Sequence, residues 1–192
     1  MTKPEIATLN RRLGCENSRL RVYLDDVQSA AGVTPSYMVV EPCEKRDSDK
    51  AGGVAVLPVR DDGAVGLLRV FRYAIGEEVW EVPRGFLDPD ESPAGSAARE
   101  VEEELGIACD ADSLMKLGVF LPEAGILRVR IHLYAAVGIA ADRAVRVSNE
   151  MGHRGFSWFP WEVAQAMALD AKIEDGASLA AMYRYSMLKA QI

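Results

Sequence analysis

Apolar segments that lie between polar stretches and turn residues predict strands in two separate regions of the chain. The segments 19–27 and 36–42 are rich in Val and Tyr, and turn residues separate them. A longer series with the same character follows, at 53–59, 64–72, 77–83, 113–121, 128–138 and 154–160. The turn Arg-Asp-Asp-Gly between the first two members of this series predicts a hairpin. The segment 1–15 is predicted to be helical or frayed.

Helical spacing of apolar residues predicts three helices, over 93–105, 161–169 and 177–190. Mostly antiparallel strands with a few helices indicate the α+β class. The polar segment 43–53 predicts a division into an N-terminal segment with a β-hairpin, 1–48, and a main domain, 49–192. Because a two-stranded hairpin is marginally stable alone, we expect it to pack on the main domain or on a second subunit.

Composition narrows the function classes. The chain has 192 residues and a net charge of -7, which argues against a general nucleic-acid binder. It contains no apolar run of 18 or more residues and no signal-peptide pattern, so we expect no membrane span. Three widely spaced cysteines suit a reducing, cytoplasmic location. With only two histidines, a histidine-rich metal site is not expected.

The helix predicted over 93–105 has clear start and stop signals. Ser92 is a good N-cap, Pro93 suits the first helical position, and Gly106 can supply a left-handed C-cap. At 100° per residue, an apolar stripe runs along one side and must face the core. The stripe consists of Ala94, Ala98, Val101 and Leu105.

Four glutamates lie at the end of this helix, and three of them converge. Glu100, Glu103 and Glu104 cluster on one flank of the apolar stripe, whereas Glu102 falls on the opposite flank. Convergent carboxylates repel one another unless a cation neutralises them. Oxygen ligands favour Mg²⁺ or Mn²⁺, which also bind substrate phosphates. The alternative is a solvated acidic face with no ligand.

The spacing of the polar residues around this helix resembles the Nudix box. Gly85 is followed after five residues by Glu91, and after seven more by Arg99-Glu100-Val101-x-Glu103-Glu104-x-Gly106-Ile107. All nine specified positions match without a gap.

This resemblance implies a fold, an activity and residue roles. The fold would be a Nudix-type α/β/α sandwich with a mixed sheet, and the activity hydrolysis of a nucleoside diphosphate linked to another moiety. Glu100, Glu103 and Glu104 would hold the cations, with the backbone carbonyl near Arg84 as a further ligand. The structural positions of the box would be Gly85, Glu91, Arg99 and Gly106.

The order of elements also resembles ADP-ribose pyrophosphatases and related nucleoside diphosphate-sugar hydrolases. The likeness implies a homodimer that shares the N-terminal hairpin, and ADP-ribose hydrolysis to AMP and ribose 5-phosphate. Pro122 lies 15 residues after Ile107, as the proline of that group does. The group has Ser-Pro-Gly there, whereas this chain reads Leu-Pro-Glu-Ala-Gly over 121–125. The alternatives are another nucleotide sugar, a dinucleotide such as NADH, a nucleoside triphosphate, or a non-catalytic nucleotide sensor.

The catalytic base and the substrate contacts are predicted from position. Related hydrolases use a glutamate from a late loop, which favours Glu150 over Glu123 as the residue that assists the metal-positioned water beside Glu103 and Glu104. Arg72 or Arg84 is expected to clamp a phosphate, because arginine binds phosphate in bidentate fashion. Glu81 and Glu123 are candidate substrate contacts. Neither histidine is assigned to the site.

Overall fold

The computed structural model describes residues 5–43, 52–88 and 90–189, and its elements form two compact units. The first unit comprises the N-terminal segment to residue 51 together with 121–130, and the second comprises 52–120 and 131–192. The predicted boundary between residues 48 and 49, and most of the polar segment 43–53, lie outside the described residues.

The first unit is a three-stranded antiparallel sheet rather than a two-stranded hairpin. Its strands are β1 (Ala7–Glu16), β2 (Leu20–Ser29) and β3 (Gly32–Pro42), in the order β1-β2-β3. The prediction of a helical or frayed segment over 1–15 is therefore wrong for β1. Pairing with β2 explains the difference, because Arg11 of β1 lies against the buried Asp25 of β2, with Nη2 at 2.7 Å from Oδ2.

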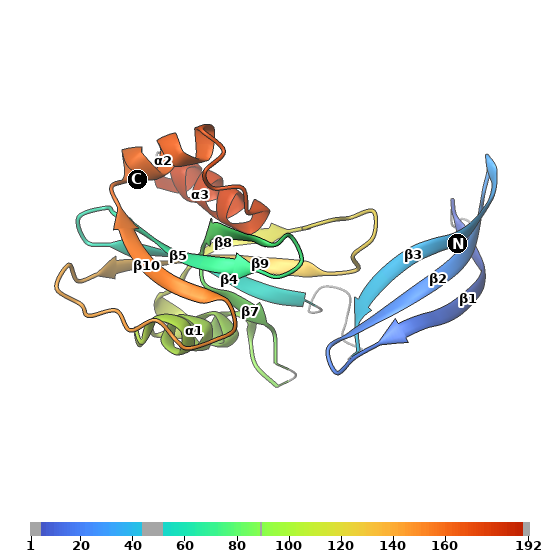
Figure 1. Cartoon of the computed structure of the whole chain (residues 1–192), viewed down its shortest axis with the longest axis horizontal. Coiled ribbons are helices and arrows are strands. Elements are labelled where there is room, and N and C mark those ends of the chain that lie inside the picture. The colour runs from blue at the N-terminus through green and yellow to red at the C-terminus, as the bar shows by residue number, and fades with distance from the viewer. Residues whose placement is uncertain (1–4, 44–51, 89, 190–192) are drawn as a thin grey trace. The chain divides into compact units, whose positions relative to one another are not determined.

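The second unit contains a seven-stranded sheet with helices on both faces (Figure 1). The main path runs β10-β5-β4-β9-β8, with β6 paired to β5 and β7 paired to β4. The strands are β4 (Gly52–Arg60), β5 (Val65–Arg72), β6 (Glu77–Glu81), β7 (Arg84–Phe86), β8 (Met115–Phe120), β9 (Arg130–Ile139) and β10 (His153–Phe159). A short 3₁₀ helix, η1, covers Ala111–Ser113.

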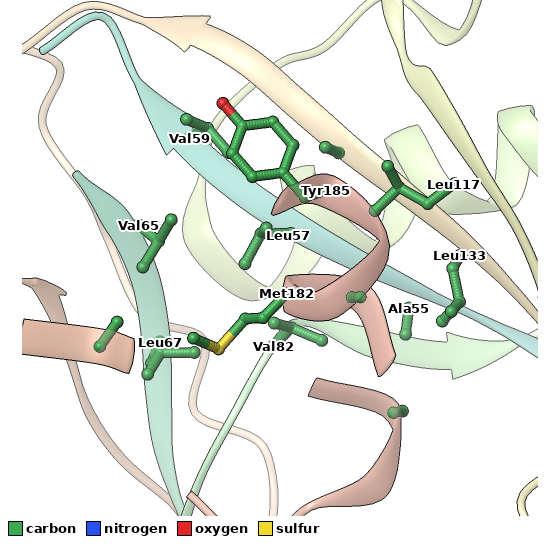
Figure 2. Close-up of a cluster of buried hydrophobic side chains, with 14 of the residues drawn as sticks. Ala55, Leu57, Val59, Val65, Leu67, Val82, Leu117, Leu133, Met182 and Tyr185 are labelled. Atoms are coloured by element: carbon green, nitrogen blue, oxygen red, sulfur yellow. The ribbon is translucent and has the colours of Figure 1, made fainter. Parts of the chain in front are cut away.

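Alternation along the central strands builds one core on each face of the sheet. On β4, Ala55 and Leu57 belong to the core beneath α2 (Trp161–Leu169) and α3 (Gly176–Lys189), whereas Val54 and Val56 belong to the core beneath α1 (Pro93–Leu105). Figure 2 shows the first core, in which Tyr185 of α3 packs over the sheet. A strand covered on both faces carries a continuous apolar run.

The three predicted helices are all present, with α1 over the predicted span and α3 one residue longer at its start. Among the described residues, no helix has both the length and the apolar character needed to cross a membrane. The helix with the acidic end, α1, covers one face of the sheet and ends beside the loop that leads into β10 (Figure 1).

Candidate active site

Hydrogen bonds from polar residues fasten the turn before α1 to the helix. The Ser92 hydroxyl accepts a hydrogen bond from the Gly95 N–H at 3.0 Å, and Gly106 ends the helix at a φ of 67°. Glu91 accepts hydrogen bonds from the Ser96 hydroxyl at 2.7 Å and from Arg99 Nε at 3.0 Å. These two bonds lower the pKa of the Glu91 carboxyl. Glu91 and Arg99 thus hold the loop against the helix.

Gly85 makes room for a carboxylate rather than for a turn. It lies on β7, and a Cβ built at this position would overlap the Glu100 carboxylate. The Glu100 side chain is buried there, with Arg99 Nη1 at 2.9 Å from its Oε1. Burial raises the pKa of Glu100, and the charge of Arg99 opposes the increase. The close approach of Glu100 to the β7 backbone therefore requires glycine.

Glu104 is the most buried carboxylate at the end of α1. Its residue is 4% exposed, and its Oε2 accepts a hydrogen bond from the Arg84 N–H at 3.1 Å. Burial, and then the charge of Glu100, raise the pKa of Glu104 to about 8. Among the described residues, few positive charges or hydrogen-bond donors offset the negative charge of Glu104 and its acidic neighbours. Such a group of carboxylates is a candidate cation-binding site.

Glu103 lies at the rim of this cluster. Its side chain is half exposed, and its Oε2 is 2.8 Å from Arg99 Nη1. Arg99 therefore contacts Glu103 as well as Glu100. Burial lowers the pKa of the Arg99 guanidinium, but the carboxylates around it raise that pKa more. The three glutamates share a flank of the helix, as the helical spacing predicts, but only Glu100 and Glu104 are buried.

The loop between β9 and β10 brings Glu150 to Glu104, and the first residue of β10, His153, follows it there. Its backbone is held to the end of α1, since Arg146 N–H donates to Leu105 O and Ser148 N–H donates to Glu104 O, both at 2.9 Å. One ligand atom from each of Glu104, Glu150 and His153 lies within 4.8 Å of the others. The late-loop glutamate chosen from the sequence is therefore next to the helix glutamates.

Both predicted phosphate-binding arginines contact one buried glutamate. Glu81 is 1% exposed and forms ion pairs with Arg72, through Nη2 and through Nε at 3.1 Å, and with Arg84 at 2.9 Å. Arg84 also reaches Asp175, with Nη1 at 2.7 Å from Oδ1. Asp175 in turn accepts two hydrogen bonds from Ser178, at the start of α3. This chain of contacts fixes both guanidinium groups at the ends of β5 and β7.

Glu123 belongs to the first unit, because residues 121–130 are part of it. Its Oε1 accepts a hydrogen bond from the Gly125 N–H at 3.1 Å, within the segment that departs from Ser-Pro-Gly. The role of Glu123 as a substrate contact or base stays a prediction.

Sequence reasoning missed His153 and Asp175. A signal for His153 was present: Glu-Met-Gly-His over 150–153 has glycine at the third position of a four-residue turn, which brings the first and fourth residues together. In the structure Gly152 has a φ of 94°, and His153 N–H donates to Glu150 O at 3.1 Å. Asp175 gave no comparable signal, since its contact with Arg84 joins residues 91 positions apart.

The donor set suits a hard divalent cation. Glu100 and Glu104 are buried carboxylates beside the β7 backbone, and Glu150 adds a third from the loop. Among the described residues, the cationic side chain that contacts Glu100 and Glu103 is Arg99, whereas Glu104 has a single backbone N–H donor. Carboxylate oxygens with this excess of negative charge are typical of Mg²⁺ and Mn²⁺ sites.

Comparison with known proteins gives consistent matches. A family model described as the NUDIX domain matches residues 49–182. The ADP-ribose pyrophosphatase of Bacillus subtilis (strain 168) is 30% identical over 129 residues, which are 67% of this chain and 64% of that protein. The ADP-ribose pyrophosphatase of Mycobacterium tuberculosis is 28% identical over 131 residues, 67% of this chain and 62% of that protein. The matched part of the chain thus spans just under two thirds of each relative's length.

A solved structure, the crystal structure of ADP compounds hydrolase, shares the fold. It matches with a TM-score of 0.73 and 17% sequence identity, over 100% of this chain and 98% of that chain. The predicted fold class, α+β with a Nudix-type α/β/α sandwich, a mixed sheet and an added N-terminal antiparallel element, is confirmed.

Proposed function

The chain belongs to the NUDIX domain family, and on this premise we propose that it hydrolyses the pyrophosphate bond of a nucleoside diphosphate linked to another moiety. The preferred substrate we propose is ADP-ribose, cleaved with water to AMP and ribose 5-phosphate. The observation that carries the proposal is the buried pair Glu100 and Glu104 at the end of α1, joined by Glu150. The similarity to two ADP-ribose pyrophosphatases supports the choice of substrate.

We assign the cofactor as Mg²⁺ or Mn²⁺, held by Glu100, Glu103 and Glu104 with the backbone carbonyl near Arg84. When bound, such a cation supplies an acidified water and offsets charge on the phosphate oxygens. The excess of buried carboxylate charge around Glu104 supports this assignment, because it would otherwise destabilise the fold.

The remaining residues would position the substrate and move a proton. Glu150, on the loop beside Glu104, would accept the proton of the attacking water. Arg72 binds Glu81 through Nε and Nη2, so its Nη1 keeps donors for a phosphate oxygen. Arg84 is held from two sides by Glu81 and Asp175. Glu81 would then orient both arginines rather than contact the substrate itself.

A homodimer is part of the proposal. The three-stranded sheet of the first unit exposes several large apolar side chains, which a second subunit would cover. These residues are Ile6, Leu9, Leu13, Val33, Tyr37 and Met38.

A substrate panel tests the proposal. ADP-ribose, NADH, ADP-glucose, GDP-mannose and a nucleoside triphosphate are each incubated with the protein and Mg²⁺, and the products are separated by chromatography. We expect AMP and ribose 5-phosphate from ADP-ribose, with a kcat/KM at least about tenfold above that of the other compounds. The absence of cleavage of every compound, with binding retained, would contradict hydrolysis and favour a sensor.

The segment 121–125 provides the specific reason to keep a second substrate in the panel. It differs from the Ser-Pro-Gly of ADP-ribose pyrophosphatases, so a different leading substrate would locate the altered specificity there. That result would overturn ADP-ribose while leaving the hydrolase assignment intact.

A further inference from the structure

His153 has one ring nitrogen fixed and the other directed at the acidic cluster. Its side chain is 5% exposed. Nδ1 lies 2.9 Å from the Ser148 hydroxyl, and Nε2 lies 3.6 Å from Glu104 Oε1. Within the described residues Nε2 forms no hydrogen bond, because 3.6 Å is too long for one. The second ring nitrogen of this mostly buried side chain thus faces the buried Glu104 carboxylate at a distance longer than a hydrogen bond.

Three different elements bring the donors of this cluster together. Glu104 comes from α1, Glu150 from the loop and His153 from the first position of β10. Their ligand atoms lie within 4.8 Å of one another. Three ligand atoms at about 2.1 Å from one ion lie about 3.0–3.6 Å from one another, so these side chains, with Glu150 exposed, would close by on the order of 1–2 Å around a bound ion.

The surroundings of the ring support a ligand role. A metal-binding histidine normally donates its second N–H to a nearby oxygen, which fixes the ring and leaves the lone pair on the other nitrogen. The Ser148 hydroxyl can accept the Nδ1 proton of His153. Ser148 is itself held in place, because its backbone N–H donates to the Glu104 carbonyl oxygen at 2.9 Å. The backbone just before His153 is held as well, since Phe71 N–H donates to Gly152 O at 2.8 Å.

We propose that His153 Nε2 is a ligand of the divalent cation, together with Glu104 and one carboxylate oxygen of Glu150, whose other oxygen stays available to accept a proton. The inference rests on the proposed metal-dependent function and adds a nitrogen donor to an otherwise all-oxygen site. Imidazole suits later transition-metal ions such as Co²⁺ and Zn²⁺ better than Mg²⁺, which prefers oxygen. The protein therefore discriminates between these ions more strongly than a site of carboxylates alone.

The competing reading is an ion pair. A protonated His153 would direct an Nε2–H at Glu104 and neutralise it, with no lone pair left for a metal. The two readings differ in whether a bound metal is coupled magnetically to an imidazole nitrogen.

Pulsed electron paramagnetic resonance on the Mn²⁺-loaded protein, without substrate, tests the proposal. We expect modulation from a directly bound imidazole ¹⁴N in the wild type, with its frequencies changed when the histidines are labelled with ¹⁵N. The chain has two histidines, so His132→Gln on β9 is the matched control. The modulation should persist in His132→Gln and disappear in His153→Gln. Bound Mn²⁺ without histidine coupling in the wild type overturns the ligand role even if the variants misfold, and leaves the proposed hydrolase intact.

Metal affinity supplies a second readout that does not depend on turnover. His153→Gln should weaken Co²⁺ binding by about 10- to 100-fold and Mg²⁺ binding by a smaller factor. Ser148→Ala, which removes the Nδ1 partner but keeps the ligand, should weaken Co²⁺ binding less and retain the nitrogen coupling. Equal losses for Co²⁺ and Mg²⁺ in His153→Gln would contradict a nitrogen ligand. If the wild-type protein shows nitrogen coupling but does not hydrolyse ADP-ribose, the proposed function would be contradicted and the ligand role of His153 retained.

Discussion

Glu104 is a carboxylate whose ionised form is destabilised both by burial and by neighbouring negative charges. It is 4% exposed and has Glu100 and Glu150 as acidic neighbours, and its pKa rises to about 8. Without a cation, ionising this carboxyl costs folding free energy. The identity of the converging glutamates could be predicted from helical spacing. Their unequal burial could not, because it depends on how Gly85 of β7 and the loop 140–152 pack against α1.

This destabilisation of the ionised form predicts a pH dependence for the stability of the metal-free protein. The pKa of Glu104 is raised in the folded state from its ordinary value of 4.5, so the folded protein binds more protons than the unfolded chain between these values. The free energy of unfolding should therefore fall as the pH rises from about 5 to 8. Urea unfolding with a chelator present measures the slope.

Glu104→Gln should flatten this slope, because the amide does not ionise. Glu102→Gln is the matched control, since Glu102 is exposed on the other flank of α1 and should leave the slope unchanged. Equal slopes in the wild type and Glu104→Gln would show that the raised pKa of Glu104 does not cause the pH dependence of stability.

At the scale of elements, the site depends on a loop and a helix whose ends are fixed by local signals. Ser92, Pro93 and Gly106 predict α1 correctly because capping depends on neighbouring residues alone. β1 was missed because Ala7–Glu16 has little apolar alternation, and its pairing with β2 is a contact between distant residues. Local patterns thus predict the helix, whereas long-range pairing decides the strand.

The fit of Glu100 against β7 predicts that Gly85→Ala displaces the Glu100 carboxylate. The added Cβ would overlap the Glu100 carboxylate and displace it, lowering the free energy of unfolding by about 1–3 kcal/mol and weakening metal binding. Gly155→Ala on β10 is the matched control, because a Cβ there meets no atom within 4 Å. Urea unfolding and Mn²⁺ titration of both variants check this, and equal behaviour of the two would argue against the close approach.

At the scale of the whole molecule, the chain combines a sheet with helices on both faces and a separate three-stranded unit. The central strand β4 is apolar on both sides, as a strand covered on both faces requires, whereas the helices on both faces are expected from the resemblance to the Nudix family. The assignment of 121–130 to the first unit could not be predicted, since these residues follow β8 and run into the start of β9, two strands of the seven-stranded sheet.

The exposed apolar residues of the first unit predict that the protein is a dimer in solution. Leu9 and Leu13 of β1 are 59% and 52% exposed, and a charge at either position would be costly in a covered interface. Leu9→Glu with Leu13→Glu should shift the sedimentation coefficient in analytical ultracentrifugation to that of a monomer. Gln28→Glu, an added charge at an exposed polar position of β2, should leave the dimer intact. A monomeric wild type would contradict this part of the proposal.

The most direct test of the central claim is the rate of ADP-ribose hydrolysis in Mg²⁺ by the wild type, Glu104→Gln and Glu102→Gln. If Glu104 is a cation ligand, Glu104→Gln should reduce kcat/KM by about 100-fold or more with the fold retained. Glu102→Gln, which differs from it only by its position on the helix, should match the wild type. Near-normal hydrolysis by a folded Glu104→Gln protein would contradict the assignment of the acidic end of α1 as the catalytic metal site.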